Sequence, residues 1–423
     1  MRITADLHIH TKYSRATSSG MTLETVALWA KRKGINLVGT GDFTHPAHFK
    51  AIEEKLAPSG SGLFAMKGKG SDGYAVHFML TAEVSNIYTQ GGRVRKIHNL
   101  IFTPSLEAAG RINSTLGRLG NVSSDGRPIF GFSAKELLKI VMDADAGSML
   151  VPAHAWTPWF SIFGSKSGFD SIEECFGDLS RYVYAIETGL SSNPRMNWRI
   201  SALDGITLIS NSDAHSPSKL GREANFFDCG MDYFDITRAI REKDGKKFLF
   251  TAEFFPEEGK YHYDGHRECG VLFSPEETRK AGGKCPVCGK DVTVGVMSRV
   301  EELSDRPAGY VPKNAIPARS IVPLQEIIAD ALGKGVTSSA VKKEYVRITD
   351  LGGSEFTILL DTPQDELLKI THPKIAEGIA KVRRGELSIT PGFDGEFGKI
   401  RISNRAEEAK PAGVPERGQM GLF

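Results

Sequence analysis

Short apolar runs alternate with amphipathic stretches over the first 250 residues of the chain. The segment that begins at Thr22 shows the repeating unit, because apolar residues recur at helical spacing from Leu23 to Ala30. Thr22 can cap the start of this helix and Gly34 can end it, and the apolar run Ile35–Thr40 follows. Such alternation is typical of a parallel α/β sheet or barrel.

Proline, glycine and charged residues break this pattern after residue 250. We therefore predict a barrel at 1–250, and a short cysteine-containing segment at 251–306. Residues 307–402 mix helical stretches such as Leu324–Leu332 with a strand-like run, Phe356–Leu360, which predicts a small α+β C-terminal domain. Residues 403–423 have too little apolar content to fold for most of their length, and we expect a disordered tether there.

Composition narrows the class of protein. Of the 423 residues, 40% are hydrophobic and 25% are charged, and no apolar stretch approaches the ~20 residues of a membrane span. The net charge is +2, so a nucleic-acid partner would have to meet a local basic face. Three of the five cysteines cluster, which favours metal binding in a reducing compartment over disulfides. We expect a cytoplasmic, nucleoid-associated protein without a membrane partner.

Histidine and acidic residues recur close to the ends of the apolar runs in the first 250 residues. They are His8, His10, Asp42, His45, Glu83, His98, His154, Asp213 and His215. His8 and His10 close the run Ile3–Leu7, for example, whereas His98 lies early in its run. Because parallel barrels gather the ends of their strands at one face, these residues predict a multinuclear metal centre.

The spacing within this set supports metal binding. His8 and His10 are two positions apart, so on a strand both side chains point to the same face and can hold one ion. Asp213 and His215 repeat this spacing, and the carboxylate of Glu83 can bridge two ions. A mixed set of nitrogen and oxygen ligands favours zinc, manganese or iron over calcium or magnesium, although magnesium can serve in an assay.

Three motifs in this region resemble those of the polymerase and histidinol phosphatase (PHP) superfamily of metal-dependent phosphoesterases. They are Asp6-Leu7-His8-Ile9-His10, Gly41-Asp42 with His45, and Asn211-Ser212-Asp213-Ala214-His215, and Glu83, His98 and His154 fall between them. The resemblance covers the first 250 residues. It implies a distorted seven-stranded (β/α)7 barrel that holds two or three divalent ions.

The resemblance also implies a distribution of ligands among the ions. The first ion takes His8, His10, Glu83 and Asp213, the second takes Glu83, His98 and His154, and the third takes His215 with Asp42 or His45. It assigns the catalytic role, activation of a water molecule, to His8, His10, Asp42, Glu83 and Asp213. The chain departs from the superfamily at Ala16, where many members carry a histidine, and in the stretched spacing of Asp42 and His45.

A second set of ligands lies in the cysteine-containing segment. His266-Arg267-Glu268-Cys269 and Cys285-Pro286-Val287-Cys288 have the same internal spacing, and glycine follows each of them. Four such ligands close the coordination sphere of zinc, so His266, Cys269, Cys285 and Cys288 predict one structural zinc. His262 is the substitute if His266 is not a ligand.

The order of barrel, zinc segment and C-terminal domain resembles the endonuclease Q family. The motifs that carry this resemblance are Gly39-Thr40-Gly41-Asp42, Val151-Pro152-Ala153-His154, Asn211–Ser216, Leu220-Gly221-Arg222-Glu223 and Pro391-Gly392-Phe393-Asp394-Gly395. The resemblance spans about residues 1–402. It implies a DNA repair endonuclease that cuts on the 5′ side of a deaminated base (uracil, hypoxanthine or xanthine) or of an abasic site.

Aromatic and basic residues are candidates for contact with damaged DNA. Trp156, Trp159 and Phe160 follow His154, and they either wedge the duplex, stack on an extruded base or pack beneath a long loop. The basic residues Lys381, Arg383 and Arg384 are grouped and are expected to contact phosphates.

The chain ends in Gln419-Met420-Gly421-Leu422-Phe423. Gln419, Leu422 and Phe423 resemble the short peptide with which bacterial repair proteins dock on the sliding clamp, so we expect the clamp as a partner.

Two other functions are compatible with the sequence. One is a 3′–5′ exonuclease, or another PHP phosphoesterase, built on the same barrel. The other is a non-catalytic, clamp-associated DNA-binding scaffold. Incision beside an internal lesion would support the endonuclease, whereas stepwise shortening of undamaged ends would support the exonuclease.

Overall fold

The computed structural model describes residues 1–68 and 76–402. The expected tether and the clamp-binding residues Gln419, Leu422 and Phe423 lie outside this range. No helix in the described part of the chain has the length and apolar character needed to cross a membrane.

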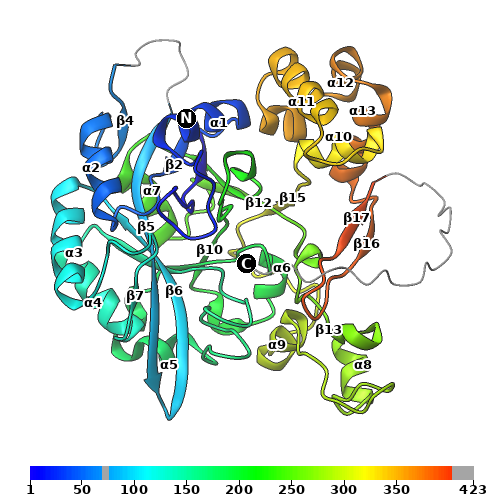
Figure 1. Ribbon diagram of the computed structural model, residues 1–423, viewed down its shortest axis with the longest axis horizontal. Helices are drawn as coiled ribbons and strands as arrows, with labels where there is room; N and C mark the ends of the chain where they lie inside the picture. The colour runs from blue at the N-terminus through cyan, green and yellow to red at the C-terminus, as the bar shows by residue number, and fades with distance from the viewer. Residues whose placement is uncertain (69–75, 403–423) are drawn as a thin grey trace, which may run out of the picture.

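Strands and helices alternate through most of the chain (Figure 1). The strands are β1 (Arg2–Asp6), β2 (Leu37–Gly39), β3 (Leu56–Pro58), β4 (Phe64–Met66), β5 (His77–Gln90), β6 (Arg93–Thr103), β7 (Ile129–Phe130), β8 (Met149–Pro152), β9 (Ala185–Glu187), β10 (Thr207–Ile209), β11 (Ala224–Asp228), β12 (Phe248–Glu253), β13 (Asp264–His266), β14 (Val271–Phe273), β15 (Ala318–Ser320), β16 (Ser388–Thr390) and β17 (Lys399–Arg401). The α-helices are α1 (Leu23–Lys33), α2 (Pro46–Lys55), α3 (Leu106–Leu119), α4 (Ala134–Ala144), α5 (Ile172–Phe176), α6 (Pro194–Asn197), α7 (Tyr233–Arg241), α8 (Pro275–Lys280), α9 (Val296–Leu303), α10 (Leu324–Leu332), α11 (Ser339–Gly352), α12 (Gln364–Ile370) and α13 (Pro373–Arg384). Shorter helical turns are η1 (Gly177–Tyr182), η2 (Ser201–Leu203), η3 (Pro217–Lys219), η4 (Pro256–Glu258), η5 (Arg267–Cys269) and the π-helical η6 (Thr357–Asp361).

The chain has a mixed α/β fold around one large sheet. Its strands follow the order β15-β12-β11-β1-β2-β5-β4-β3, and β6, β7 and β8 continue it through β5 and β6. The β1–β2 and β2–β5 pairs are parallel, whereas the β1–β11, β5–β6 and β6–β8 pairs are antiparallel. The α/β class is confirmed with a mixed rather than purely parallel sheet, and a closed seven-stranded barrel stays a prediction. The parallel pair β9–β10 lies outside this strand order.

The local signals around the first helix are confirmed. Helix α1 begins after Thr22, whose side chain accepts a hydrogen bond from the Thr25 backbone N–H, and it ends at Gly34 in the left-handed region with φ 87°. Only glycine adopts this conformation without strain, so Gly34 stops the helix where the sequence predicts.

Strand β5 differs from the sequence-based prediction. It continues to Gln90, so Glu83 lies within the strand and does not follow its end. Strand β6 turns back along it over its full length, and the two form the long hairpin at the bottom of Figure 1. The alternating direction of side chains along this hairpin, and not the end of a strand, places Glu83.

Separate hydrophobic cores underlie the parts of the chain. Both faces of the large sheet are covered by buried apolar side chains, which include Val296 and Val300 of α9. A second core lies among α10–α13, the helices at the upper right of Figure 1, and a small third core surrounds Val271, Cys285 and Val292. Strand β15 lies beyond residue 307 yet pairs with β12, so pairing of the large sheet crosses the predicted boundary.

The run Phe356–Leu360 is helical, which contradicts the predicted strand. Residues Thr357–Asp361 form the π-helical turn η6, with Ile358 and Leu359 buried against the neighbouring helices. A short continuous apolar run has no period of its own, so packing decides its conformation. The guanidinium of Arg383 donates hydrogen bonds to the carbonyl oxygens of Ile358, Leu359 and Thr362 and so stabilises the end of this turn.

A buried ion pair joins α1, in the first 250 residues, to the C-terminal helices. Lys33 Nζ lies 2.7 Å from Glu355 Oε2, and the two side chains are only 2% and 4% exposed. Glu355 also accepts hydrogen bonds from the Tyr345 hydroxyl and the Leu324 backbone N–H. The carboxylate is thus fully partnered only when α1 and the C-terminal helices are packed together.

We expect Lys33→Ala to destabilise the protein by about 3 to 5 kcal/mol, because it leaves the Glu355 carboxylate buried without a cation. The free energy of unfolding, measured by urea denaturation, checks this value. Lys50 forms an exposed pair with Glu54, so Lys50→Ala should change it by less than about 1 kcal/mol. Equal effects of the two substitutions would contradict a special role for the buried pair.

Candidate metal centre

His8, His10 and Asp213 direct one ligand atom each toward a common point. The His8 and His10 Nε2 atoms and Asp213 Oδ1 are buried, and they have no hydrogen-bond partner among the described residues. The three ligand atoms lie within 4.8 Å of one another. The opposite ring nitrogens are held in place, since His8 Nδ1 lies 3.0 Å from Glu187 Oε1 and His10 Nδ1 lies 3.2 Å from Asp42 Oδ1. Histidines that bind a metal are oriented in this way.

The carboxylate of Asp6 joins the two segments that carry this group. It accepts hydrogen bonds from the Ser212 backbone N–H and hydroxyl and from the Gly221 N–H. Burial raises the pKa of Asp6 to about 6 even though these hydrogen bonds lower it. An isolated parallel β-bridge between Ile9 and Ala214 also joins these two segments. The end of β1 and the loop after β10 are therefore fixed to each other.

Three residues of the site have left-handed backbone conformations. Asp42, His154 and Asp213 have φ values of 44°, 30° and 47°. Residues with a Cβ seldom adopt such angles, and the strain is tolerated only where the surroundings fix it. The strained positions coincide with the residues whose side chains meet in the site.

Glu83, His98 and His154 form a second group with ligand atoms within 4.8 Å of one another. Glu83 Oε1 lies 2.9 Å from His98 Nδ1 and 3.1 Å from His154 Nε2. In the β5–β6 hairpin Glu83 stands opposite Leu100, two positions from His98, so Glu83 and His98 share a face. Burial lowers the pKa of His98 to about 4.

Glu83 lies between the two groups. Its Oε1 faces His98 and His154, whereas its Oε2 lies 3.1 Å from His10 Nε2. Burial opposes ionisation of this carboxyl group, yet the charges of His98 and Arg127 hold its pKa well below the ordinary value. The geometry is that of a carboxylate able to bridge two ions.

The residues predicted to hold a third ion have partners within the protein. The Asp42 carboxylate accepts hydrogen bonds from the Thr11 backbone N–H and hydroxyl and from the Ser14 hydroxyl. His45 Nε2 lies 3.2 Å from the Ser123 carbonyl oxygen. Within residues 1–68 and 76–402, the candidate metal groups contain neither of them, nor His215.

A third ion held by His215 with Asp42 or His45 therefore stays a prediction. His215 uses its Nδ1–H toward the Asp213 carbonyl oxygen, and its ring lies 4.5 Å from that of His10. Asp42 instead acts on the site through His10. Sequence spacing could not separate these roles, because a carboxylate that binds an ion and one that orients a histidine occupy similar places.

Two charged residues contribute to the site beyond the predicted ligands. Arg127 donates a hydrogen bond to Glu83 Oε2 at 3.0 Å, although its segment is rich in glycine and serine and has no catalytic signature. Glu187, at the end of β9, contacts His8 and also accepts from the His154 backbone N–H and from Asn211. In the sequence, the only indication that Glu187 belongs to the site is its position directly after the apolar run that ends at Ile186.

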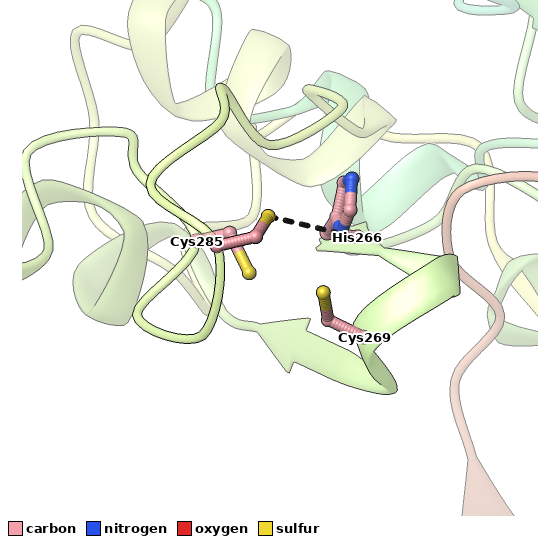
Figure 2. A group of neighbouring side chains, drawn as sticks. His266, Cys269 and Cys285 are labelled. Atoms are coloured by element: carbon pink, nitrogen blue, oxygen red, sulfur yellow. Dashed lines mark hydrogen bonds between the residues drawn. The ribbon is translucent and has the colours of Figure 1, made fainter.

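The cysteine-containing segment brings its four predicted ligands together. Figure 2 shows His266, Cys269 and Cys285 pointing into one space beside the β13–β14 hairpin. With Cys288, whose Sγ lies 3.8 Å from His266 Nδ1, the ligand atoms lie within 4.8 Å of one another. His262 is buried away from this group, so His266 fits the site better than its substitute.

The aromatic residues after His154 have different environments. Trp156 is 1% exposed and donates a hydrogen bond to Asn197, which contradicts its expected contact with DNA. Its indole is part of the core instead. Trp159 is 40% exposed, and the Phe160 ring lies 4.7 Å from that of His98.

The three basic residues of α13 that are expected to contact phosphates have partners within the protein. Arg383 donates hydrogen bonds to the carbonyl oxygens of Ile358, Leu359 and Thr362, and its contact with phosphate stays a prediction. Arg384 pairs with Glu386, and Lys381 Nζ lies 3.3 Å from the Ile402 carbonyl oxygen. Intramolecular partners thus hold all three cations.

A cavity of about 840 Å³ opens beside the candidate metal groups. Phe160, which contacts His98, lines it, and so does Arg222, which donates hydrogen bonds to the Ser212 and Asp213 carbonyl oxygens. The other side is formed by residues 258–261, which we call the neck of the cysteine-containing segment, and by the C-terminal part, for example through Glu326. Three parts of the chain are therefore needed to enclose it.

Comparison with known proteins gives relatives along the whole chain. Residues 323–386 match the family model described as the MJ0043 C-terminal domain. Uncharacterized protein MJ0043 of Methanocaldococcus jannaschii is 38% identical over 60% of this chain, which spans about a third (32%) of that longer protein. Uncharacterized protein YqxK of Bacillus subtilis is 30% identical over 95% of this chain and 99% of its own length.

Two solved structures resemble the whole chain. The lesion-specific endonuclease PfuEndoQ from Pyrococcus furiosus is 35% identical, with a TM-score of 0.84, over 97% of this chain and 98% of its own. Endonuclease Q in complex with a 27-mer duplex substrate, with an abasic lesion at the active site, is 35% identical, with a TM-score of 0.83, over 97% and 99%. With two assembled groups of metal ligands and this degree of likeness along its length, the chain belongs to the endonuclease Q family.

Proposed function

We propose that this protein is a DNA repair endonuclease that hydrolyses the phosphodiester bond 5′ of a deaminated base (uracil, hypoxanthine or xanthine) or of an abasic site. The observation that carries the proposal is the pair of buried ligand groups joined by Glu83. A large cavity lies nearby, with Phe160, the ring neighbour of His98, in its wall. Membership of the endonuclease Q family supports the substrate, since one relative was solved with an abasic duplex at its active site.

The ligand groups fit two divalent ions, with zinc, manganese or iron favoured by the mixture of imidazole and carboxylate. His8, His10 and Asp213 would hold one ion, His98 and His154 the other, and Glu83 both. The unpartnered Nε2 and Oδ1 atoms of the first group support this assignment, because buried polar atoms without partners are costly. When bound, such ions lower the pKa of a coordinated water and stabilise charge on phosphate oxygens.

The protein's own residues position these ligands and add charge. Glu187 and Asp42 fix the rings of His8 and His10, so that both Nε2 atoms face the site. Arg127 lies beside Glu83 and is in place to attract the phosphate of the cleaved bond.

The cavity beside the ligands is the proposed place for the extruded lesion. Phe160 and Trp159 line it, and aromatic rings are suited to stack on a nucleobase. A volume of about 840 Å³ lies within the usual range of ligand sites. We propose that Trp159 and Phe160 stack on the base or wedge the duplex, whereas buried Trp156 supports the loop from within.

We further propose that His266, Cys269, Cys285 and Cys288 hold one structural zinc. The small apolar core around Val271, Cys285 and Val292 is too limited to order this segment, so ligand bonds would supply the missing stability. The neck of this segment forms one side of the cavity, and its order therefore bears on substrate binding.

The C-terminal residues Gln419, Leu422 and Phe423 are proposed to bind the sliding clamp, on the strength of their sequence alone. We propose that Lys381 and Arg384 contact DNA phosphates. To do so, Lys381 would release the Ile402 carbonyl oxygen and Arg384 would release Glu386.

Glu83→Gln should reduce incision of duplexes that carry uracil or an abasic site by at least about a hundredfold, because the shared ligand loses its charge. Product mapping on end-labelled duplexes and metal analysis of the purified variant check this. His77→Gln changes a histidine outside the ligand groups and should retain activity. Full incision by Glu83→Gln would refute the two-ion site, and shortening of undamaged ends by the wild type would indicate an exonuclease.

Cys285→Ser should remove one equivalent of zinc and lower the thermal unfolding temperature, because the segment loses a ligand that holds it folded. Elemental analysis and calorimetry measure the two effects. Cys175→Ser, a buried cysteine outside the group, is the control for loss of a thiol. Unchanged zinc content in Cys285→Ser would exclude this site.

Deletion of residues 419–423 should abolish binding to the sliding clamp and leave incision of short oligonucleotides intact, because the active site lies elsewhere in the chain. Surface plasmon resonance against immobilised clamp measures the first effect. Replacement of Met420 and Gly421 by alanine keeps Gln419, Leu422 and Phe423 and serves as the control. Clamp binding by the deleted protein would refute the assignment.

A further inference from the structure

Glu258 is an acidic residue in the wall of the cavity. It lies at the end of η4, between β12 and β13. Its Oε1 atom is buried and has no partner among the residues that the structure describes. Aromatic side chains, among them Phe160, Phe254 and Tyr261, form much of the same wall.

None of the three basic residues that line the cavity neutralises this carboxyl group. Lys219 Nζ lies 3.1 Å from Glu326 Oε1 and pairs with it. Arg222 directs its guanidinium to the Ser212 and Asp213 carbonyl oxygens. Lys260 Nζ lies 4.5 Å from the centre of the Phe397 ring.

A carboxyl group in such a place is easier to keep neutral than ionised. Burial is the main cause that raises the pKa of Glu258, and together with the charges of Glu326 and Glu257, and against those of Lys219 and Arg222, it brings the pKa to about 8. At neutral pH the group therefore carries a proton, and its hydroxyl can donate a hydrogen bond.

Deaminated bases present the matching acceptor. Deamination replaces an amino group by a ring carbonyl, whereas an abasic site has no base to contact. A protonated carboxyl group in an aromatic cavity suits such a carbonyl oxygen, since a buried donor without an acceptor is costly.

We propose that Glu258 is a specificity-determining residue whose carboxyl group donates a hydrogen bond to a ring carbonyl oxygen of the extruded base. This inference rests on the proposed function and assigns the recognition of the base, as distinct from cleavage of the backbone, to one side chain. The metal ligands act on every substrate alike, whereas Glu258 acts only where a base is present.

The test compares kcat/KM for uracil-containing and abasic duplexes of the same sequence. Glu258→Ala should lower kcat/KM on uracil about tenfold, the effect of one lost hydrogen bond, and change it less than about twofold on the abasic site. Glu258→Gln keeps a donor in its amide and should stay within about threefold of the wild type on both. Glu53→Gln is the control for loss of a carboxylate, since this exposed residue of α2 does not line the cavity.

The pH profile provides a second readout that a structural role would not change. In the wild type the ratio of kcat/KM for uracil to that for the abasic site should fall as pH rises through about 8, because Glu258 loses its proton. In Glu258→Gln the ratio should be flat. Ionisation at the metal centre affects both substrates and cancels in the ratio.

The outcomes separate this inference from the proposed function. Equal losses on both substrates in Glu258→Ala, or a pH-dependent ratio in Glu258→Gln, would overturn the role of Glu258 while leaving the endonuclease in place. A wild-type protein that incises neither duplex would overturn the proposed function, and this inference with it.

Discussion

The burial of several ionisable groups in one small volume is the constraint on which the site depends. His8, His10 and Glu83 are almost fully buried, and Asp213 is only partly exposed. Charged groups out of water are costly unless each finds a partner. Glu187 and Asp42 hold the outer ring nitrogens of His8 and His10, and Arg127 pairs with Glu83. The His8 and His10 Nε2 atoms and Asp213 Oδ1 face the site without a hydrogen-bond partner among the described residues. The same arrangement that stabilises the fold therefore creates a place for cations.

The partners that hold these groups come from distant parts of the sequence. Asp6 fixes the loop that carries Asp213 through Ser212 and Gly221, and Glu187 fixes both His8 and the backbone of His154. Each of these contacts joins segments that belong to, or directly follow, different strands. The left-handed backbone at Asp213 and His154 is the local cost of bringing such segments together.

The cavity shows how the additional segments serve the same site. Strands of the first 250 residues and the loops that follow them supply the ligands, but the neck of the cysteine-containing segment and the C-terminal part complete the wall in which Glu258 lies. The buried pair of Lys33 and Glu355 holds the C-terminal helices against α1. Recognition of a substrate thus depends on packing between parts of the chain, and the chemistry depends on the ligands of the first part.

The sequence by itself determined the identity and local geometry of most candidate ligands. Three short spacings bring ligands together through the backbone geometry of a few residues: His8 with His10 just after β1, His266 with Cys269, and Cys285 with Cys288. Only the tertiary structure decided that Glu83 lies within a long hairpin, that Asp42 orients His10, and that Arg127 reaches the site. It also decided the burial of Trp156 and the helical turn at Thr357–Asp361. Local spacing fixes which way neighbouring side chains point, whereas burial, strand register and contacts across the chain arise only when distant segments pack.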